Sequence, residues 1–259
     1  MLRRLERNDS FESWVLVPQI EHAWLSGGLA ETWAAPTLAK IEPHDELIEA
    51  IGLHDDGWAE WDSAPDVDPV SGRPLSFVEM PLEAATTIWR RSIDLAAEQG
   101  PLAAHVVSAH FNALLQQAAP RWSVDPRQFQ LSREFLNEQS EQREIWFMQW
   151  QRENPSVRTR RMVDQALAYL QFFDRLSLWL CAAPRSEPEL FATPDGTEVV
   201  FEPRDSTHFT VRPWPLTVDR LTWTMTTRRV PVRHYASRAA LAATPGEPNE
   251  LRFKLTAAP

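Results

Sequence analysis

Apolar residues recur at helical spacing through most of the first 181 residues of the chain. A short strand is expected first, over residues 14–17, where β-branched and aromatic side chains run up to Pro18. Helices are then predicted over residues 19–33, 43–54, 81–99, 101–118, 126–153 and 155–181. Most of these segments begin at or just after a proline, which is favoured in the first turn of a helix. The pattern predicts an all-α bundle.

The pattern changes towards the C-terminus. Short, partly alternating runs of apolar and polar residues follow, separated by proline-rich turns, at 198–202, 208–212, 220–226 and 251–255. Such runs are typical of a small antiparallel sheet, which the early strand 14–17 could join. The expected fold class is therefore mainly α, with an HD-like helical core over 1–185 and a small β-rich extension over 186–259.

Two adjacent glycines, Gly27 and Gly28, lie inside the helix predicted over 19–33. Each costs a helix roughly 1 kcal/mol relative to alanine. We therefore expect them to mark a close approach of another backbone segment.

Composition narrows the class of protein. The 259 residues carry a formal net charge of −10, which opposes binding to the phosphates of nucleic acids. The single cysteine, Cys181, excludes an intramolecular disulfide framework and any site built from several cysteines. The N-terminus has no apolar leader segment, and no apolar run reaches the ~18 residues of a membrane span. The chain is expected to be soluble and cytoplasmic, with a small-molecule partner, no membrane partner and an open oligomeric state.

The candidate chemistry centres on His54 and Asp55, which end an apolar helix directly before Asp56-Gly57. Three further candidates lie on other predicted helices, namely His22, Asp174 and one of the pair His105/His110. Imidazole nitrogens and carboxylate oxygens together suit one or two divalent transition-metal ions, with iron or manganese favoured. His105 and His110 are five positions apart in one helix and so point ~140° apart. Both cannot easily face one ion, and the spacing does not say which of the two does.

The order His22, then His54-Asp55-Asp56-Gly57, then Asp174 resembles the HD-domain superfamily of metal-dependent phosphohydrolases and related oxygenases. More narrowly, Glu21-His22-Ala23, His54 to Trp58 and Val107 to Phe111 look like an uncharacterised bacterial family, domain of unknown function 3891. The resemblance implies an HD-like helical fold with His22, His54, Asp55 and Asp174 as metal ligands. The narrower resemblance favours His110 over His105, as a ligand of a second ion or as a residue next to the ligands, and brings no established activity.

Several residues near the motif have a simpler alternative role. Asp56 is the candidate catalytic carboxylate, or equally a solvated acid at a helix end. Arg73, Trp58 and Trp61 are candidates for substrate binding around the long loop 62–80, a length typical of lids. A solvated arginine and two core tryptophans are the plainer interpretation. His44-Asp45 is a second His-Asp pair, at the start of a helix, where the negative charge of an aspartate stabilises the helix dipole. We therefore do not expect this pair to bind a metal.

Three functions fit this sequence. The first is a metal-dependent hydrolase of a small phosphorylated compound, in which the ion activates a water molecule. The second is a di-iron oxygenase of the same superfamily, and the third is a non-catalytic metal- or ligand-binding protein. The metal content separates the second from the first, and the absence of any metal binding would favour the third.

Overall fold

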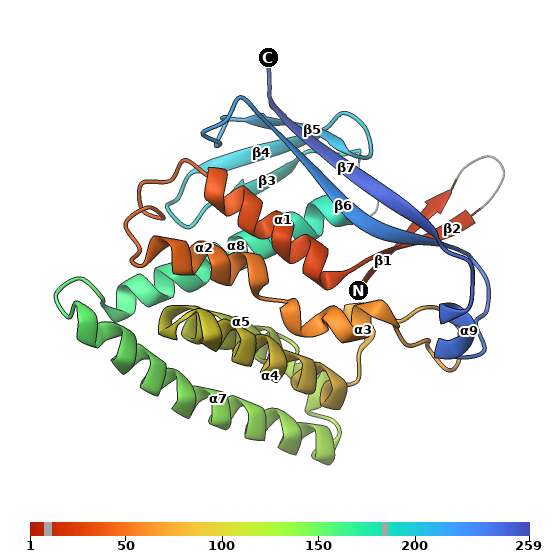
Figure 1. Ribbon diagram of the computed structural model, residues 1–259, viewed down its shortest axis with the longest axis horizontal. Helices are drawn as coiled ribbons and strands as arrows, with labels where there is room; N and C mark the ends of the chain where they lie inside the picture. Colours follow the sequence, from red (N-terminus) through yellow and green to blue (C-terminus); the bar gives the residue numbers. More distant parts are fainter. Residues whose placement is uncertain (8–11, 183–185) are drawn as a thin grey trace.

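A computed structural model describes residues 1–7, 12–182 and 186–259. One curled sheet lies on one side of a set of helices (Figure 1). The principal helices are α1 (Gln19–Thr32), α2 (His44–Leu53), α4 (Leu82–Gln99), α5 (Pro101–Gln117), α7 (Pro126–Glu153) and α8 (Arg160–Cys181). Shorter elements are the 3-10 turns η1 (Asp56–Trp58) and η2 (Phe77–Glu79) and the helices α3 (Ala59–Ser63), α6 (Ala119–Trp122) and α9 (Arg238–Ala242). All six predicted helices are present, the last beginning at Arg160 rather than 155.

The sheet has seven strands in the order β1-β2-β6-β7-β5-β4-β3. All neighbours are antiparallel except the parallel pair β5 and β7. The strands are β1 (Leu2–Arg7), β2 (Glu12–Val17), β3 (Glu189–Ala192), β4 (Glu198–Pro203), β5 (His208–Arg212), β6 (Arg220–Pro231) and β7 (Glu247–Ala257). The two N-terminal strands therefore extend the sheet made by the C-terminal segment.

The predicted fold class, a mainly α protein with a small C-terminal sheet and an all-α core, was wrong. The sheet is large, and its strands come from both ends of the chain. Strand β1 has a charged sequence that gives no alternating signal, yet it pairs with β2 from Leu2↔Val17 to Arg7↔Glu12. Segments 1–185 and 186–259 thus share one sheet, and residue 185 itself lies outside the described residues.

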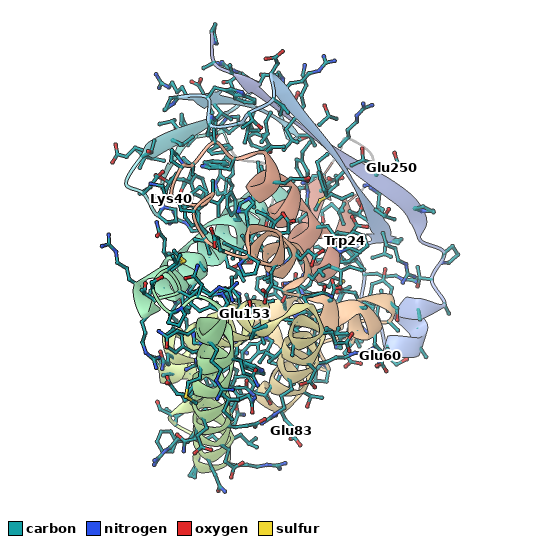
Figure 2. The ribbon with its side chains drawn as sticks, turned by 60° about the vertical axis from the view of Figure 1, so that its left-hand side comes forward. Trp24, Lys40, Glu60, Glu83, Glu153 and Glu250 are labelled. Atoms are coloured by element: carbon teal, nitrogen blue, oxygen red, sulfur yellow. The ribbon has the colours of Figure 1, made fainter. Side chains whose placement is uncertain are left out.

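Helices α1 and α8 fill the side of the sheet that faces the bundle, and helices α2, α4, α5 and α7 lie beyond them (Figures 1 and 2). Trp179 of α8 packs its ring 5.5 Å from Phe191, 5.9 Å from Phe201 and 5.2 Å from Phe209 on three successive strands. Central helix α5 packs against α2, α4, α7 and α8. This arrangement places one face each of α1, α2, α5 and α8 around a common interior. Among the described residues, no helix is both long and apolar enough to span a bilayer.

The two glycines of α1 serve different contacts. A Cβ on Gly27 would lie 2.8 Å from the Cα of Gly52, so the backbones of α1 and α2 touch there. This confirms the predicted close approach for Gly27. A Cβ on Gly28 would instead meet the indole of Trp223 on β6 at 2.2 Å. Gly27 thus allows α1 and α2 to pack closely, and Gly28 allows α1 to pack against Trp223 of the sheet.

Candidate metal centre

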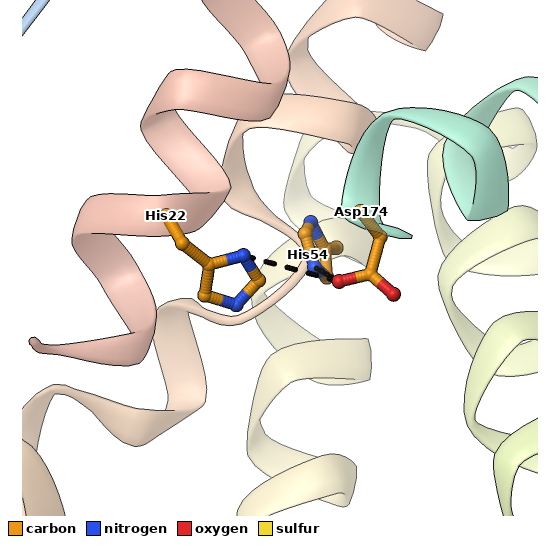
Figure 3. Close-up of side chains that lie close together, drawn as sticks. All are labelled: His22, His54 and Asp174. Carbon is orange, nitrogen blue, oxygen red and sulfur yellow. Dashed lines mark ion pairs between the residues drawn. The ribbon is translucent and has the colours of Figure 1, made fainter. Parts of the chain in front are cut away.

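Four helical segments bring three histidines and an aspartate into the interior of the bundle. His22 lies in α1, His54 directly follows α2, His110 lies in α5 and Asp174 lies in α8. All four are buried; His54 has no exposed surface and Asp174 only 9 %. One potential ligand atom each from His22, His54 and Asp174 lie within 4.8 Å of one another (Figure 3). Three separate helices thus converge on one point.

The carboxylate of Asp174 links the histidines. Its Oδ1 lies 3.4 Å from Nε2 of His54 and 3.9 Å from Nδ1 of His22. Its Oδ2 lies 3.8 Å from Nε2 of His110. The two oxygens therefore face different histidines, and only Oδ1 is shared by His22 and His54.

Asp55 holds His22 from the opposite side. Its Oδ2 lies 2.9 Å from Nε2 of His22 and 3.9 Å from Nε2 of His54. The amide of Gln19 donates a hydrogen bond of 3.1 Å to the same oxygen. The Ser177 hydroxyl donates its own proton to the carbonyl of Asp174, so Nδ1 of His22 donates to Ser177. Nε2 of His22 and Oδ2 of Asp55 then face each other, as two ligands of one cation would.

His54 has one ring nitrogen fixed and one unsatisfied. Its Nδ1 donates a hydrogen bond of 2.8 Å to the carbonyl of Ile51 in α2. No described residue makes a hydrogen bond to its buried Nε2, which faces Asp174 and Asp55. A carbonyl partner on one ring nitrogen is the usual device that aims the other at a metal ion. The donor set and this unsatisfied nitrogen fit a divalent cation.

The electrostatics of the metal-free site favour positive charge at this point. Burial alone would lower the pKa of His54, but the carboxylates of Asp55 and Asp174 outweigh it and raise that pKa to about 9. Burial would raise the pKa of Asp174, yet the close contact with the ring of His54, at 3.4 Å, and the charge on that ring hold it well below its usual range. Burial lowers the pKa of His110 to about 4, so this histidine is neutral. In the metal-free protein His54 therefore carries a proton, and the same carboxylates that stabilise this proton would stabilise a bound cation.

Sequence reasoning missed the residues that orient these groups. The hydroxyl of Ser177 lies 3.0 Å from Nδ1 of His22, and Ser26 donates to Ser177 at 2.8 Å. Gln19 contacts both His22 and Asp55. Helical spacing was the available signal, because Ser177 lies three positions after Asp174 and Gln19 three positions before His22, on the same helix faces.

We expect Ser177→Ala to weaken metal binding by about 10- to 100-fold, as removal of an outer hydrogen bond to a ligand histidine typically does. The measurement is a metal titration by calorimetry. Ser132→Ala is the matched control, because Ser132 is also a buried helical serine but bonds only the carbonyl of Phe129 on α7. Equal affinities of the two variants would contradict a role of Ser177 in orienting His22.

The structure separates His105 from the cluster. Nδ1 of His105 lies 3.0 Å from the carbonyl of Arg143 on α7, on the face of α5 away from Asp174. Asp56 opens η1 and is half-buried, and the indole of Trp24 donates to its carboxylate. Burial raises the pKa of Asp56. Asp56 forms no ion pair with the histidines of the cluster.

The three candidate substrate contacts lie elsewhere. Arg73 is half-exposed and lies 4.0 Å from Glu79. Trp58 and Trp61 pack edge to face 5.7 Å apart, in a second hydrophobic core under loop 62–80. That loop is anchored by its own turns and by a hydrogen bond from Tyr235 N to Gly72 O. Trp61 also lines a groove of ≈ 500 Å³ between α3 and α4.

A comparison with protein families matches residues 5–232 to a profile described as a protein of unknown function, DUF3891. The chain belongs to the DUF3891 family. The matched segment begins in β1, ends just after β6 and contains every candidate ligand named above. No curated protein and no solved structure matches the chain. The wider resemblance to the HD-domain superfamily has no such match.

Proposed function

We propose that this DUF3891 protein is a metal-dependent hydrolase of a small phosphorylated compound, of the HD type. The observation that carries the proposal is the buried convergence of His22, His54 and Asp174, with Nε2 of His54 unsatisfied among the described residues. His22, His54, Asp55 and Asp174 would hold one divalent ion, with iron or manganese favoured by the nitrogen and oxygen donors. When bound, such an ion polarises a phosphoryl oxygen and acidifies water.

The residues around the site would position the ligand side chains and exclude solvent from the ion. Asp55 and Ser177 fix the ring of His22, and the carbonyl of Ile51 fixes the ring of His54. The low exposure of His22 and His54 keeps bulk water from the charged groups, which strengthens every electrostatic interaction in the site. Rigid helices on three sides make the donor set preorganised.

A di-iron oxygenase is the second candidate, and one observation favours it. Oδ2 of Asp174 faces His110 at 3.8 Å while its Oδ1 faces His54 and His22, so His110 and Asp174 would be the residues to hold a second ion. Against it, the described residues contain no second group of three close ligand side chains. One ion per chain therefore agrees better with the geometry.

The test is purified protein loaded with manganese or iron and assayed against a panel of phosphoesters. We expect turnover that His54→Ala abolishes and that His44→Ala, at the start of α2, leaves intact. Turnover that survives His54→Ala would contradict the assignment. Two irons per chain with oxygen uptake would favour the oxygenase. Metal binding without turnover would leave a non-catalytic metal-binding protein.

We expect the affinity for the metal to rise with pH up to about 9. The ion must replace the proton of His54, whose pKa is raised to about 9 in the metal-free protein. Below that value the affinity should fall roughly tenfold for each unit of pH. Metal titrations between pH 6 and 9, with proton release measured in two buffers, check this.

Metal-free protein provides the control for this pH dependence. Because the pKa of His54 is raised from 6.5 to about 9 on folding, its stabilising contribution is complete below pH 6.5 and is lost as pH rises through about 9. Unfolding experiments with chelator should show this loss, and metal-loaded protein should not. A metal affinity that is independent of pH would contradict the exchange of a proton for the ion.

A further inference from the structure

A hollow of ≈ 540 Å³ on the outer face of the sheet gathers four basic side chains, His208 of β5, Arg220 of β6, and Arg252 and Lys254 of β7. Side chains alternate between the two faces of a strand. On β7, the residues that alternate with these cations are buried, namely Leu251, Phe253 and Leu255. Arg252 and Lys254 therefore point away from the helices. The hollow therefore lies on the face of the sheet opposite the candidate metal centre.

The strand register concentrates these charges. Lys254 lies directly opposite His208 on one side and Thr222 on the other. Arg252 is two positions along the same strand, and Arg220 is diagonal to Lys254 through Thr256. Like charges on neighbouring positions of a sheet destabilise it. In a chain with 36 acidic and 26 basic residues, composition alone does not predict such a cluster.

One described acid, Asp205, lies at the rim of the hollow. Its Oδ1 accepts hydrogen bonds of 2.8 Å from the backbone N–H groups of Thr207 and His208. Arg220, Arg252 and Lys254 form no ion pair with any described carboxylate. Three permanent positive charges thus line the hollow beside a single negative one.

In a neighbouring hollow of the same sheet, by contrast, two arginines are paired with a carboxylate. This hollow is lined by Arg4 and Arg229 among others, and both of these pair with Glu6, at 2.9 and 2.7 Å. Both of these sheet cations are therefore neutralised by a carboxylate of the fold itself. The unpaired set next to them requires a different explanation.

We propose that the hollow formed by His208, Arg220, Arg252 and Lys254 binds a small compound that carries two or more linked phosphoryl groups. Arginine forks and a lysine ammonium are suited to phosphoryl oxygens, and the hydroxyls of Thr207 and Thr222 add donors at the rim. A volume of ≈ 540 Å³ lies within the range of about 300–1,000 Å³ for small-molecule sites. Three fixed charges suit a multiply charged anion better than a single phosphate.

A nucleic acid is a poorer occupant, because the chain as a whole carries a net charge of −10, which repels an extended phosphate backbone. Nε2 of His208 lies 3.1 Å from the hydroxyl of Thr256, which holds the ring at the edge of the hollow. The site does not depend on the proposed hydrolase activity. Its occupant is bound on the far side of the sheet from His54.

The test is calorimetric titration with pyrophosphate at constant ionic strength, on the full chain. The double variant Arg252→Gln/Lys254→Gln should lose at least about tenfold in affinity, because it removes two positive charges and their charge-assisted hydrogen bonds to phosphoryl oxygens. Arg127→Gln is the matched control, since Arg127 is an exposed cation on α7, paired with Glu83, far from the sheet. It should leave the affinity unchanged.

Without ligand, the double variant should unfold at the same temperature as the parent or slightly higher, because repulsion between the two cations is removed. If it fails to fold, Lys254→Gln and Arg220→Gln singly carry the test. Failure of pyrophosphate to bind, or an equal loss in Arg127→Gln, would overturn the proposal. Tighter binding of orthophosphate or of a single-stranded oligonucleotide than of pyrophosphate would also overturn it.

Discussion

Replacing Asp174 with asparagine is expected to abolish stoichiometric metal binding. The substitution preserves shape but removes the negative charge that faces His54 at 3.4 Å and His110 at 3.8 Å. Removal of hydrogen bonds outside the ligand set costs metal sites about 10- to 100-fold in affinity, so loss of a direct carboxylate ligand should exceed about 100-fold. Metal content per chain after gel filtration, and calorimetric titration, measure the effect.

The same variant separates binding from folding. We expect Asp174→Asn to fold, because loss of the carboxylate lowers the pKa of His54 and lets this buried ring become neutral. Added metal at ~100 times its dissociation constant should stabilise the parent protein by about 2.7 kcal/mol and the variant not at all. Thermal unfolding with metal and with chelator reads out this difference.

Asp164→Asn is the control for this experiment. Asp164 lies on the exposed side of the same helix, α8, and makes the same change of charge. It should retain the metal content and the metal-dependent gain in stability of the parent. Full metal binding by Asp174→Asn would contradict the site, and an equal loss in both variants would point to a general effect of charge.

The sequence predicted the helices well because their apolar positions repeat every three or four residues and their starts carry prolines. The same periodicity predicted that His105 and His110 would not both join the cluster, since two side chains ~140° apart on a helix cannot face one point, and the family resemblance favoured His110. The structure places His110 beside Asp174 and His105 beside α7. Order and helix placement along the chain therefore located the cluster without any knowledge of how the helices pack.

The sheet was underestimated for a physical reason. Strand β1 reads Leu-Arg-Arg-Leu-Glu-Arg, and its charged residues form pairs that only the folded chain reveals, such as Arg3 with Glu79 and Glu6 with Arg229. Strand β6 continues through Arg228 and Arg229 beyond the predicted end at 226, held by its register with β7 and β2. Pairing between distant segments stabilises these strands, and local periodicity does not report it.

The contacts within the site could not be predicted from the sequence for the same reason, because they depend on how distant segments pack. That Asp55 faces His22, and that the carbonyl of Ile51 binds His54, depends on the crossing of α1 and α2. At that crossing the backbones of α1 and α2 touch at Gly27 and Gly52. The site geometry therefore depends in part on this backbone contact.

This dependence yields the second prediction of large effect, a comparison of Gly27→Ala with Gly52→Ala. Both glycines lie in helices at the same contact, and each alanine gains about 1 kcal/mol of helix propensity. A Cβ on Gly52 would lie 3.6 Å from Gly27 Cα, an ordinary contact, whereas a Cβ on Gly27 would lie 2.8 Å from Gly52 Cα. The first substitution is accommodated, and the second forces two backbones apart.

We expect Gly52→Ala to be neutral or stabilising by up to about 1 kcal/mol. Overpacking costs about 1–3 kcal/mol, so Gly27→Ala should be less stable than Gly52→Ala by that amount. Chemical denaturation of the metal-free proteins measures the difference. Because α1 carries His22 and α2 leads directly into His54, whose rings lie 5.4 Å apart, Gly27→Ala should also weaken metal binding by about tenfold or more.

Equal stability and equal metal affinity of the two alanine variants would contradict this account of the helix contact. A loss of stability in Gly27→Ala with unchanged metal affinity would show that the ligands adjust independently of the helices that carry them. The expected outcome is a joint loss, because the ring of His22 is fixed to α8 through Ser177 and to Asp55 at the end of α2. Displacement of α1 by even a few tenths of an ångström then changes the distances among all the donors at once.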